Sequence, residues 1–178
     1  MLPYFQLCLD ELPYIPAILT GTKVLTVFIS EDLPMDITAN GENWLIREYT
    51  ATDKLIFKDL TNPASFIKPF PLSPKLVEQD FPVWDGGGIP DDIFDEIIAM
   101  ENSGRITDYY DIVELNYGHK LGGYPSFCQS GAYFGDDFEF VLQIASDEKA
   151  NLNIIDNGTI YLAKNSKIGE WRFYCDFL

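Results

Sequence analysis

Residues 119–129, HKLGGYPSFCQ, form the stretch from which we interpret the rest of the chain. The stretch contains the only histidine, one of the three cysteines, a Gly-Gly pair and a proline, and it separates a predicted helix from a predicted strand. The two glycines beside Tyr124 and Pro125 indicate a backbone that turns sharply or approaches another group closely, because glycine reaches positive φ without steric cost. We therefore expect a loop that is built for its shape.

The composition is that of one globular, acidic unit. The 178 residues are 47% hydrophobic and include 12 Lys and Arg against 28 Asp and Glu, which gives a net charge of −16. This length suits one buried core, and no apolar run is long enough to cross a bilayer. The negative charge repels phosphate backbones and anionic lipid, so we expect neither nucleic acid nor membrane as a partner, and we favour a basic protein. The N-terminus lacks the basic region of a secretory signal, so we expect a cytoplasmic protein, and we favour a monomer over an oligomer.

Apolar patterns predict strands in the first and last thirds of the chain. Residues 24–29 do not alternate between apolar and polar, which indicates a central strand with both faces covered. The last predicted strand does alternate, so we expect it to be half-buried. The predicted strands are residues 4–9, 24–29, 44–49, 55–57, 138–145, 159–163 and 171–177.

The middle of the chain is predicted to be irregular and helical. Four prolines between residues 62 and 74 exclude a regular helix or a central strand, which indicates an extended surface connector. Residues 90–102 carry an apolar stripe at helical spacing and predict a helix. Residues 107–117 predict a second helix, with Thr107 as its N-cap. The glycines at 86–88 lack the Lys-Ser/Thr and the preceding strand of a P-loop, so we favour a hinge or a surface loop there.

The two ends of the chain share a pattern that indicates internal duplication. We predict pseudo-repeats over about residues 3–60 and 119–178, joined by the middle 61–118, with each half covering apolar surface that the other cannot bury alone. At one constant offset Gln6, Asp10, Glu11, Ile18, Gly21 and Thr22 match Gln143, Asp147, Glu148, Ile155, Gly158 and Thr159, where about one identity is expected by chance.

The chemistry of the 119–129 stretch has two interpretations. His119 and Cys128 could form a base and nucleophile pair, or they could be a histidine that bonds the turn backbone and a buried thiol. We favour the second, since no Asn or Asp is singled out to orient the histidine. A glutamine between apolar strand residues is costly to bury without hydrogen bonds, so we expect Gln143 or Gln129 to hold the backbone of Gly122 and Gly123.

Metal and cofactor sites are not predicted. A single histidine excludes a His-rich transition-metal site, and the three widely spaced cysteines indicate neither a disulfide framework nor a zinc knuckle. Asp136, Asp137 and Glu139 form only a fragment of a calcium motif, so we favour a solvated acidic face there, which could also meet Lys and Arg on a basic partner.

The run His119-Lys120-Leu121-Gly122-Gly123-Tyr124-Pro125, followed by Gln129, by Leu142-Gln143-Ile144 with Ser146-Asp147, and by Asp156-x-Gly158, resembles the YwqG-like family of bacterial proteins, the domain-of-unknown-function family numbered 1963. Phe5-Gln6-Leu7 with Leu12-Pro13 and the later VLTVFIS are similar to the opening of that family. The chain departs from the family at residues 154–158, IIDNG, and at residues 143–147, QIASD. The family resembles, more distantly, the programmed cell death protein 2 group, whose members are chaperones of a basic ribosomal protein.

The resemblance implies an α+β fold, mainly antiparallel β, with internally duplicated β units and two short helices in the middle. It also implies a protein-binding role, since bacterial members are associated with toxin and immunity gene neighbourhoods and no catalytic activity defines the family. We therefore expect a non-enzymatic, immunity-like or chaperone-like factor for a basic protein. The alternative is a small-ligand-binding protein or a cryptic hydrolase centred on residues 119–129. The expected binding residues are His119, Lys120, Gly122, Gly123, Tyr124, Pro125, Gln129, Gln143 and Asp156.

Overall fold

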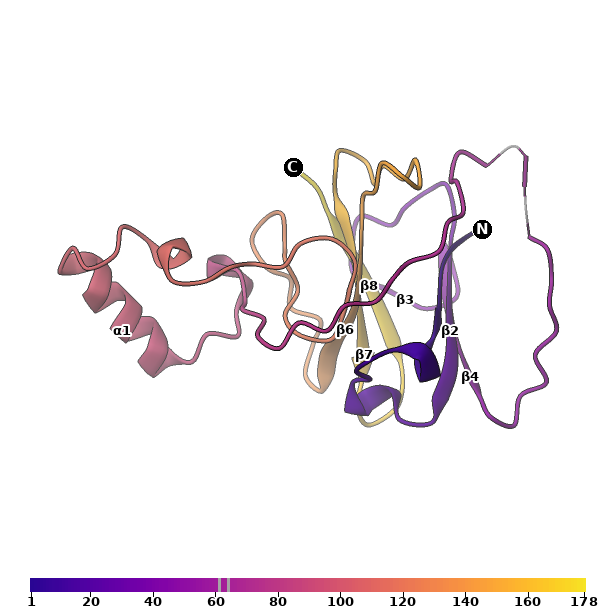
Figure 1. The fold of residues 1–178 in the computed structure, drawn as a ribbon, viewed down its shortest axis with the longest axis horizontal. Coiled ribbons are helices and arrows are strands. Elements are labelled where there is room, and N and C mark those ends of the chain that lie inside the picture. The colour runs from indigo at the N-terminus through magenta and orange to yellow at the C-terminus, as the bar shows by residue number, and fades with distance from the viewer. Residues whose placement is uncertain (61, 64) are drawn as a thin grey trace.

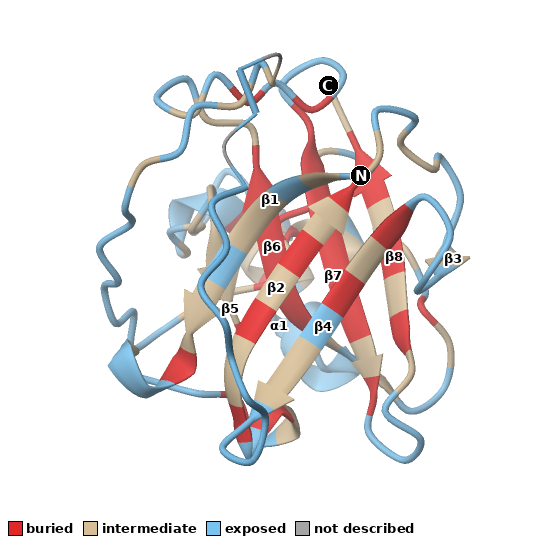
Figure 2. Ribbon diagram, turned by 90° about the vertical axis from the view of Figure 1, so that its right-hand side faces the viewer, coloured by how far each residue is buried: buried red, intermediate tan, exposed pale blue. Residues whose placement is uncertain are grey.

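Two antiparallel sheets stack face to face and form the body of the protein (Figures 1 and 2). The structure, a computed structural model, describes residues 1–60, 62–63 and 65–178. Sheet A has the strand order β1 (Leu2–Cys8), β2 (Thr22–Ile29), β4 (Trp44–Thr50). Sheet B has the order β3 (Thr38–Ala39), β8 (Trp171–Asp176), β7 (Thr159–Asn165), β6 (Phe138–Ala145), β5 (Lys120–Leu121). The predicted α+β, mainly antiparallel fold is therefore confirmed.

Most of the predicted strands are present, with two differences. β2 is the central strand of sheet A, but only its inward face is fully buried, at Leu25, Val27 and Ile29. The strand with both faces covered is β7, in which six of the seven residues are buried. The predicted strand at residues 55–57 is wrong, because this apolar run lies exposed in irregular chain, with Phe57 92% accessible. The rest of the predicted connector 62–74 is extended and largely exposed, and its residue 64 lies outside the described residues.

Sheet B is the middle layer of the protein, because apolar side chains project from both of its faces into packed clusters. Toward sheet A, Ile144 and Phe173 pack against residues such as Trp44, whose ring centroid lies 5.4 Å from that of Phe173. On the opposite face, Tyr161 packs in a second apolar cluster with Phe127. Phe127 belongs to the 119–129 stretch, so this stretch and the chain after it cover the outer face of sheet B.

Each sheet contains one strand–turn–strand–strand unit, β1-β2-β4 in sheet A and β6-β7-β8 in sheet B. The pairing of β1 with β2 shifts register between Pro3 and Phe5, and the pairing of β6 with β7 shifts between Phe140 and Leu142. At the offset that aligns Gln6 with Gln143, these two irregularities coincide. The coincidence supports the proposed duplication, since bulges are specific features of a strand.

One of the two predicted helices is present. α1 spans Asp91–Asn102, close to the predicted 90–102. The second prediction is wrong, because residues 107–117 contain only a 3₁₀ turn, Tyr109–Asp111. Asp108 rather than Thr107 is its N-cap, and the Asp111 carboxylate turns back to accept the backbone N–H of Thr107 and Asp108, which closes a single turn. No helix in the described part of the chain has the length and apolar character needed to cross a membrane.

A carboxylate joins the two sheets. Glu48 of β4 accepts hydrogen bonds from Thr22 Oγ1 at 2.6 Å, Lys164 Nζ at 2.8 Å and Trp171 Nε1 at 2.9 Å. Lys164 and Trp171 belong to sheet B, so the hydrogen bonds of Glu48 connect sheet A to sheet B. Burial raises the pKa of Glu48, but the donated hydrogen bonds, with that of Lys164 the strongest, outweigh it and bring the pKa below its ordinary value.

We predict that Glu48→Gln flattens the acid dependence of stability. The folded pKa of Glu48 is lowered, so its stabilisation is present above the unfolded pKa and is lost as the pH falls through the folded value. Urea unfolding between about pH 6 and about pH 3 should therefore show a shallower fall in the variant than in the wild type. At neutral pH we expect the variant to be about 2 kcal/mol less stable, as for a lost hydrogen bond to a charged group. Equal slopes for wild type and Glu48→Gln, with exposed Glu42→Gln as control, would contradict this role.

Candidate functional site

The 119–129 stretch begins as an added edge of sheet B. β5 pairs antiparallel with β6, with Lys120 opposite Gln143 and Leu121 opposite Leu142. Gly122 continues the pairing, because its backbone N–H donates to Val141 O at 2.8 Å. Gly122 and Gly123 then have φ values of 75° and 72°, so the chain leaves the sheet through two left-handed residues that favour glycine. The glycine pair thus forms the turn that we expected.

Gln143 closes this loop from the sheet beneath it. Its side chain is almost completely buried; Oε1 accepts the N–H of Ser126 at 2.8 Å and Nε2 donates to Gly118 O at 2.8 Å. The amide therefore binds the chain on both sides of Gly122 and Gly123 rather than the glycines themselves. Gln129 does not take part, since its Nε2 donates to Phe177 O at 2.7 Å.

Asp80 holds the glycines from the other side. Its carboxylate accepts the N–H of Tyr124 at 2.8 Å and Lys120 Nζ at 3.0 and 3.2 Å, and it also accepts Asn116 Nδ2 at 3.1 Å. Lys120 donates a further hydrogen bond to Tyr124 O at 2.7 Å. Burial lowers the pKa of Lys120, while Asp80 opposes that effect. The sequence did not point to Asp80, because it lies in irregular chain with no motif around it.

A buried carboxylate fixes the far end of the loop. Asp176 is 2% exposed; its Oδ2 accepts the N–H of Cys128 at 3.0 Å and of Gln129 at 3.2 Å. Its Oδ1 lies 2.9 Å from the hydroxyl of Tyr161, which also lies 2.9 Å from Ser126 O. Burial, and then the Asp176 charge, raise the pKa of Tyr161 above its ordinary value, so the hydroxyl acts as a donor. Asp176 lies at the end of a strand whose sequence shows only alternation of apolar and polar residues. Its hydrogen bonds to the loop could therefore not be predicted from the sequence.

The hydrogen bonds of His119 indicate which of its ring nitrogens is an acceptor. Its Nδ1 accepts the N–H of Ala145 at 3.2 Å, so the hydrogen of the neutral ring lies on Nε2, which faces Asp147 Oδ2 at 3.3 Å. The ring also packs on Phe5, with centroids 5.4 Å apart. Burial raises the pKa of Asp147, but hydrogen bonds from the backbone N–H of Lys149 and Ala150 and from His119 outweigh it and lower the pKa. The histidine therefore joins β6 to the turn that follows it.

His119 and Cys128 do not form a dyad. His119 contacts Ala145 and Asp147, whereas the Cys128 thiol lies 3.9 Å from Thr159 Oγ1 and 4.0 Å from the Tyr161 hydroxyl. Burial and the Asp176 charge raise the pKa of the Cys128 thiol, which disfavours the nucleophilic thiolate.

We predict that Cys128 reacts with iodoacetamide several-fold more slowly than free cysteine at pH 7.5, because its thiolate fraction is reduced. Labelling at each cysteine is followed by peptide mass spectrometry, with urea-unfolded protein as the control for full reactivity. Labelling of Cys128 faster than that of free cysteine would restore the hydrolase interpretation.

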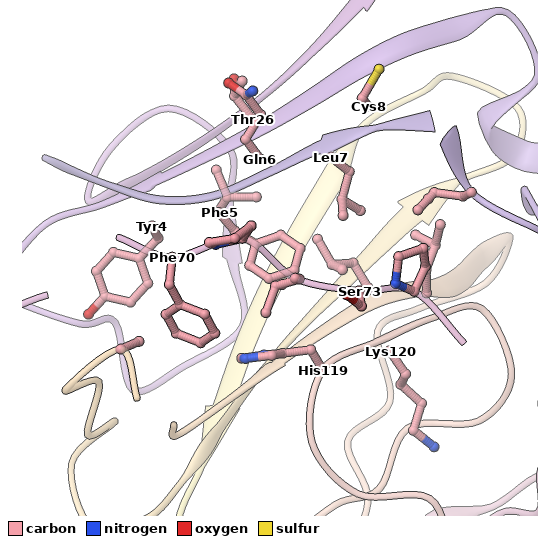
Figure 3. Close-up of a pocket in the computed structure, with 18 of the residues that line it drawn as sticks. Tyr4, Phe5, Gln6, Leu7, Cys8, Thr26, Phe70, Ser73, His119 and Lys120 are labelled. Atoms are coloured by element: carbon pink, nitrogen blue, oxygen red, sulfur yellow. The ribbon is translucent and has the colours of Figure 1, made fainter. Parts of the chain in front are cut away.

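A cavity of about 1350 Å³ lies beside the start of the loop. Its walls are β1, residues 57–60, 62, 65 and 67–78 in and around the connector, and residues 119–123. Phe5, Leu7 and Phe70 extend toward this space, with His119 at its edge, while Gln6 and Thr26 lie together on the other side of β1 (Figure 3). The connector is attached at the cavity itself, where Lys68 N donates to Ala150 O at 2.7 Å and both residues belong to the lining. The cavity is lined mainly by apolar side chains.

The remaining predicted residues lie apart from this network. Asp156 occupies an exposed turn, where its backbone carbonyl accepts the N–H of Leu178. Asp136 accepts the hydroxyl of Tyr133 and Asp137 pairs with Lys167 at 2.9 Å, so the two carboxylates have separate partners. Across residues 1–60, 62–63 and 65–178, no three His, Cys, Asp or Glu side chains come together as a metal site. The loop is thus a hydrogen-bonded junction.

Comparison with known proteins agrees with the resemblance seen in the sequence. A family model described as a domain of unknown function, DUF1963, matches residues 14–173, which is nearly the whole chain. The match includes β2, α1, the 119–129 stretch and the first half of β8. No curated protein matches the chain. The family resemblance is therefore confirmed: the chain belongs to the DUF1963 family.

Proposed function

We propose that this protein is a non-enzymatic protein-binding module, an immunity-like or chaperone-like factor for a basic protein partner. The observation that carries the proposal is the distribution of charge. Residues 85–114 contain nine Asp and Glu against one Arg, so this segment supplies half of the net charge of −16. A field of one sign on one part of a surface attracts and orients a partner of the opposite sign.

The acidic segment stands apart from the sandwich. We call residues 82–114 the arm; Figure 1 shows α1 at its far end, away from both sheets. The arm is attached to the sandwich by Val83, which packs with Phe127 in the second apolar cluster. Within the arm, the hydroxyl of Tyr109 donates to Pro82 O at 2.9 Å. α1 is about 18 Å long at 1.5 Å per residue. A partner can therefore reach the arm without displacing the sandwich.

The loop supports the non-enzymatic part of the proposal. The polar groups of Lys120, Asp80, Gln143 and Asp176 are hydrogen-bonded to the backbone and side chains of the protein itself. Such groups hold a shape, and none of them faces a second reactive group in the way that a nucleophile faces its base. We expect the loop to keep sheet B and the root of the arm in a fixed relation.

Affinity capture from the native host tests the proposal. The purified protein is immobilised at low salt, bound proteins are identified by mass spectrometry, and each candidate is then purified and titrated by calorimetry at two salt concentrations. We expect basic proteins whose affinity falls as salt screens the charges. Recovery of only acidic or unrelated abundant proteins would contradict a basic partner.

One observation favours a second candidate, a small apolar ligand. The cavity beside His119 has a volume of about 1350 Å³ and is lined mainly by apolar side chains. Ligand sites are concave and mostly apolar, with few polar groups. Native mass spectrometry of freshly purified protein would detect a bound molecule as a mass excess that disappears on denaturation. The unmodified chain mass alone would count against this candidate.

A further inference from the structure

An aromatic row runs across the arm. The rings of Phe94 and Trp84 stack with centroids 4.5 Å apart, those of Trp84 and Tyr109 lie 5.2 Å apart, and those of Tyr109 and Tyr110 lie 5.3 Å apart. Phe94 and Tyr110, at the two ends, are 38% and 51% exposed. The four rings come from three separate segments of the chain and contact one another in sequence. Tyr109 is buried, at 4% exposure, so Phe94, Trp84 and Tyr110 are the accessible rings of the row.

Two more apolar side chains close in the sequence to these rings are exposed. Ile97 is the only buried residue of α1, although the helix carries apolar side chains at helical spacing. Ile93 of α1 and Ile112, next to the 3₁₀ turn, are each 44% exposed. Exposed contiguous apolar surface on a soluble domain marks an interaction site.

Carboxylates lie close in the sequence to the rings of the aromatic row. Asp91 and Asp95 lie within one helical turn of Phe94, Asp85 follows Trp84, and Asp108 and Asp111 bracket the two tyrosines. Backbone N–H groups of Thr107 and Asp108 donate to Asp111 and lower its pKa, so that this carboxylate stays charged in mildly acidic solution. The arm has one cation, Arg105, among these groups.

We propose that the aromatic row and its carboxylates are the docking surface for an arginine- or lysine-rich segment of the partner. Guanidinium and ammonium groups are attracted to the faces of aromatic rings, and the neighbouring carboxylates pair with the same cations. The charge selects this occupant: a second copy of the arm has the same strong negative charge and is repelled. This inference rests on the proposed function and specifies where and how the basic partner is recognised.

Titration with a nona-arginine peptide at low salt tests the surface. Trp44 and Trp171 are buried, at 0% and 3% exposure, so a change in tryptophan fluorescence reports on Trp84, and calorimetry gives the dissociation constant. The ring variant is Phe94→Leu with Tyr110→Leu, which keeps apolar volume and removes two π faces. We expect about a fivefold weaker affinity, as for the loss of two exposed cation–π contacts.

The charge variant and its control separate docking from general attraction. Asp91→Asn with Asp95→Asn removes two charges from the arm, and Glu31→Gln with Asp32→Asn removes two exposed charges between β2 and β3. We expect the arm variant to bind about tenfold more weakly and the control to stay within about twofold of wild type. Circular dichroism checks that α1 remains folded in each variant.

The outcomes distinguish the two proposals. If the wild type does not bind nona-arginine, both the basic-partner function and this surface are wrong. If the wild type binds, but the arm and control charge variants weaken equally, or the ring variant binds like wild type, docking at the aromatic row is overturned while attraction of a basic partner stands.

Discussion

Replacing Gln143 by leucine is expected to lower the free energy of unfolding by about 3 kcal/mol. Leucine fills a similar volume but leaves the Ser126 N–H and the Gly118 carbonyl without their partner inside the protein. Each unpaired buried polar group costs about 1–3 kcal/mol, whereas the apolar replacement adds little strain. Urea unfolding of Gln143→Leu, with the slope compared to wild type, measures the loss.

The matched control lies at the corresponding place in the other half of the chain. Gln6 aligns with Gln143 in the predicted repeat, but its side chain on β1 is exposed. Gln6→Leu therefore makes the same chemical change without leaving a buried group unpaired, and we expect a change within about 0.5 kcal/mol. Equal losses for the two variants would mean that Gln143 stabilises its strand and not the loop.

Replacing Gly123 by alanine is expected to cost about 3 kcal/mol, for two separable reasons. The φ of 72° is unfavourable for a residue with a side chain, by about 1–2 kcal/mol. In addition, a Cβ at this position would collide with the carboxylate of Asp80. Asp80 would have to move away from Tyr124 N and Lys120 Nζ, and a partly buried lysine would lose its partner.

Gly104→Ala isolates the first of these costs. Gly104 has the same φ of 72°, and a Cβ there would meet nothing within 4 Å. We expect its loss to stay near 1 kcal/mol, so that the difference between the two alanine variants in thermal or urea unfolding measures the Asp80 contact. Losses of the same size would show that Asp80 adjusts freely and that the loop is not held by it.

Most strands could be predicted because the burial of each strand leaves a pattern in its own sequence. Burial on one face leaves an alternating pattern, as in Trp171, Phe173 and Cys175, and burial on both faces leaves a continuous one, as in β7. The same rule failed at residues 55–57, where an apolar run stays exposed and has no neighbouring strand in the part of the chain that the structure describes. Apolar composition indicates a strand only where another strand is available to pair with it.

The prediction of a second helix at residues 107–117 was wrong because side-chain hydrogen bonds competed with helix formation. Asp108 and Asp111 bond to the backbone around them and close one turn, and beyond it the Asn116 and Gly118 carbonyls accept Ser126 Oγ and Gln143 Nε2. These partners lie 10 and 25 residues further along the chain, so helical spacing alone could not reveal them.

The sequence indicated some residues of the loop network, but it did not indicate the two carboxylates that hold the loop in place. The glycine pair, Lys120 and Gln143 were found because their residue types are unusual at those places. Asp80 and Asp176 were not found, since one lies in irregular chain and the other in an ordinary alternating strand. Both become important only through contacts 44 and 48 residues away, to Tyr124 and Cys128, which depend on the complete fold.

The loop and the arm have different roles in the protein. The loop fixes the outer face of sheet B through Gln143, Asp80 and Asp176, and this face carries the root of the arm through Phe127 and Val83. The arm carries the exposed aromatic row and half of the net charge. We propose that a basic partner is bound at the arm, away from the glycine loop and the cavity.

Binding at the arm is tested by two-dimensional ¹H–¹⁵N spectra of the 20.2 kDa chain, recorded during titration with nona-arginine. We predict saturable shifts confined to the amides of residues 84–112 and to the indole N–H of Trp84, and loss of these shifts when salt is added. Shifts centred on residues 119–124 and β1, or shifts spread evenly over all acidic surfaces with no preference for the arm, would contradict it.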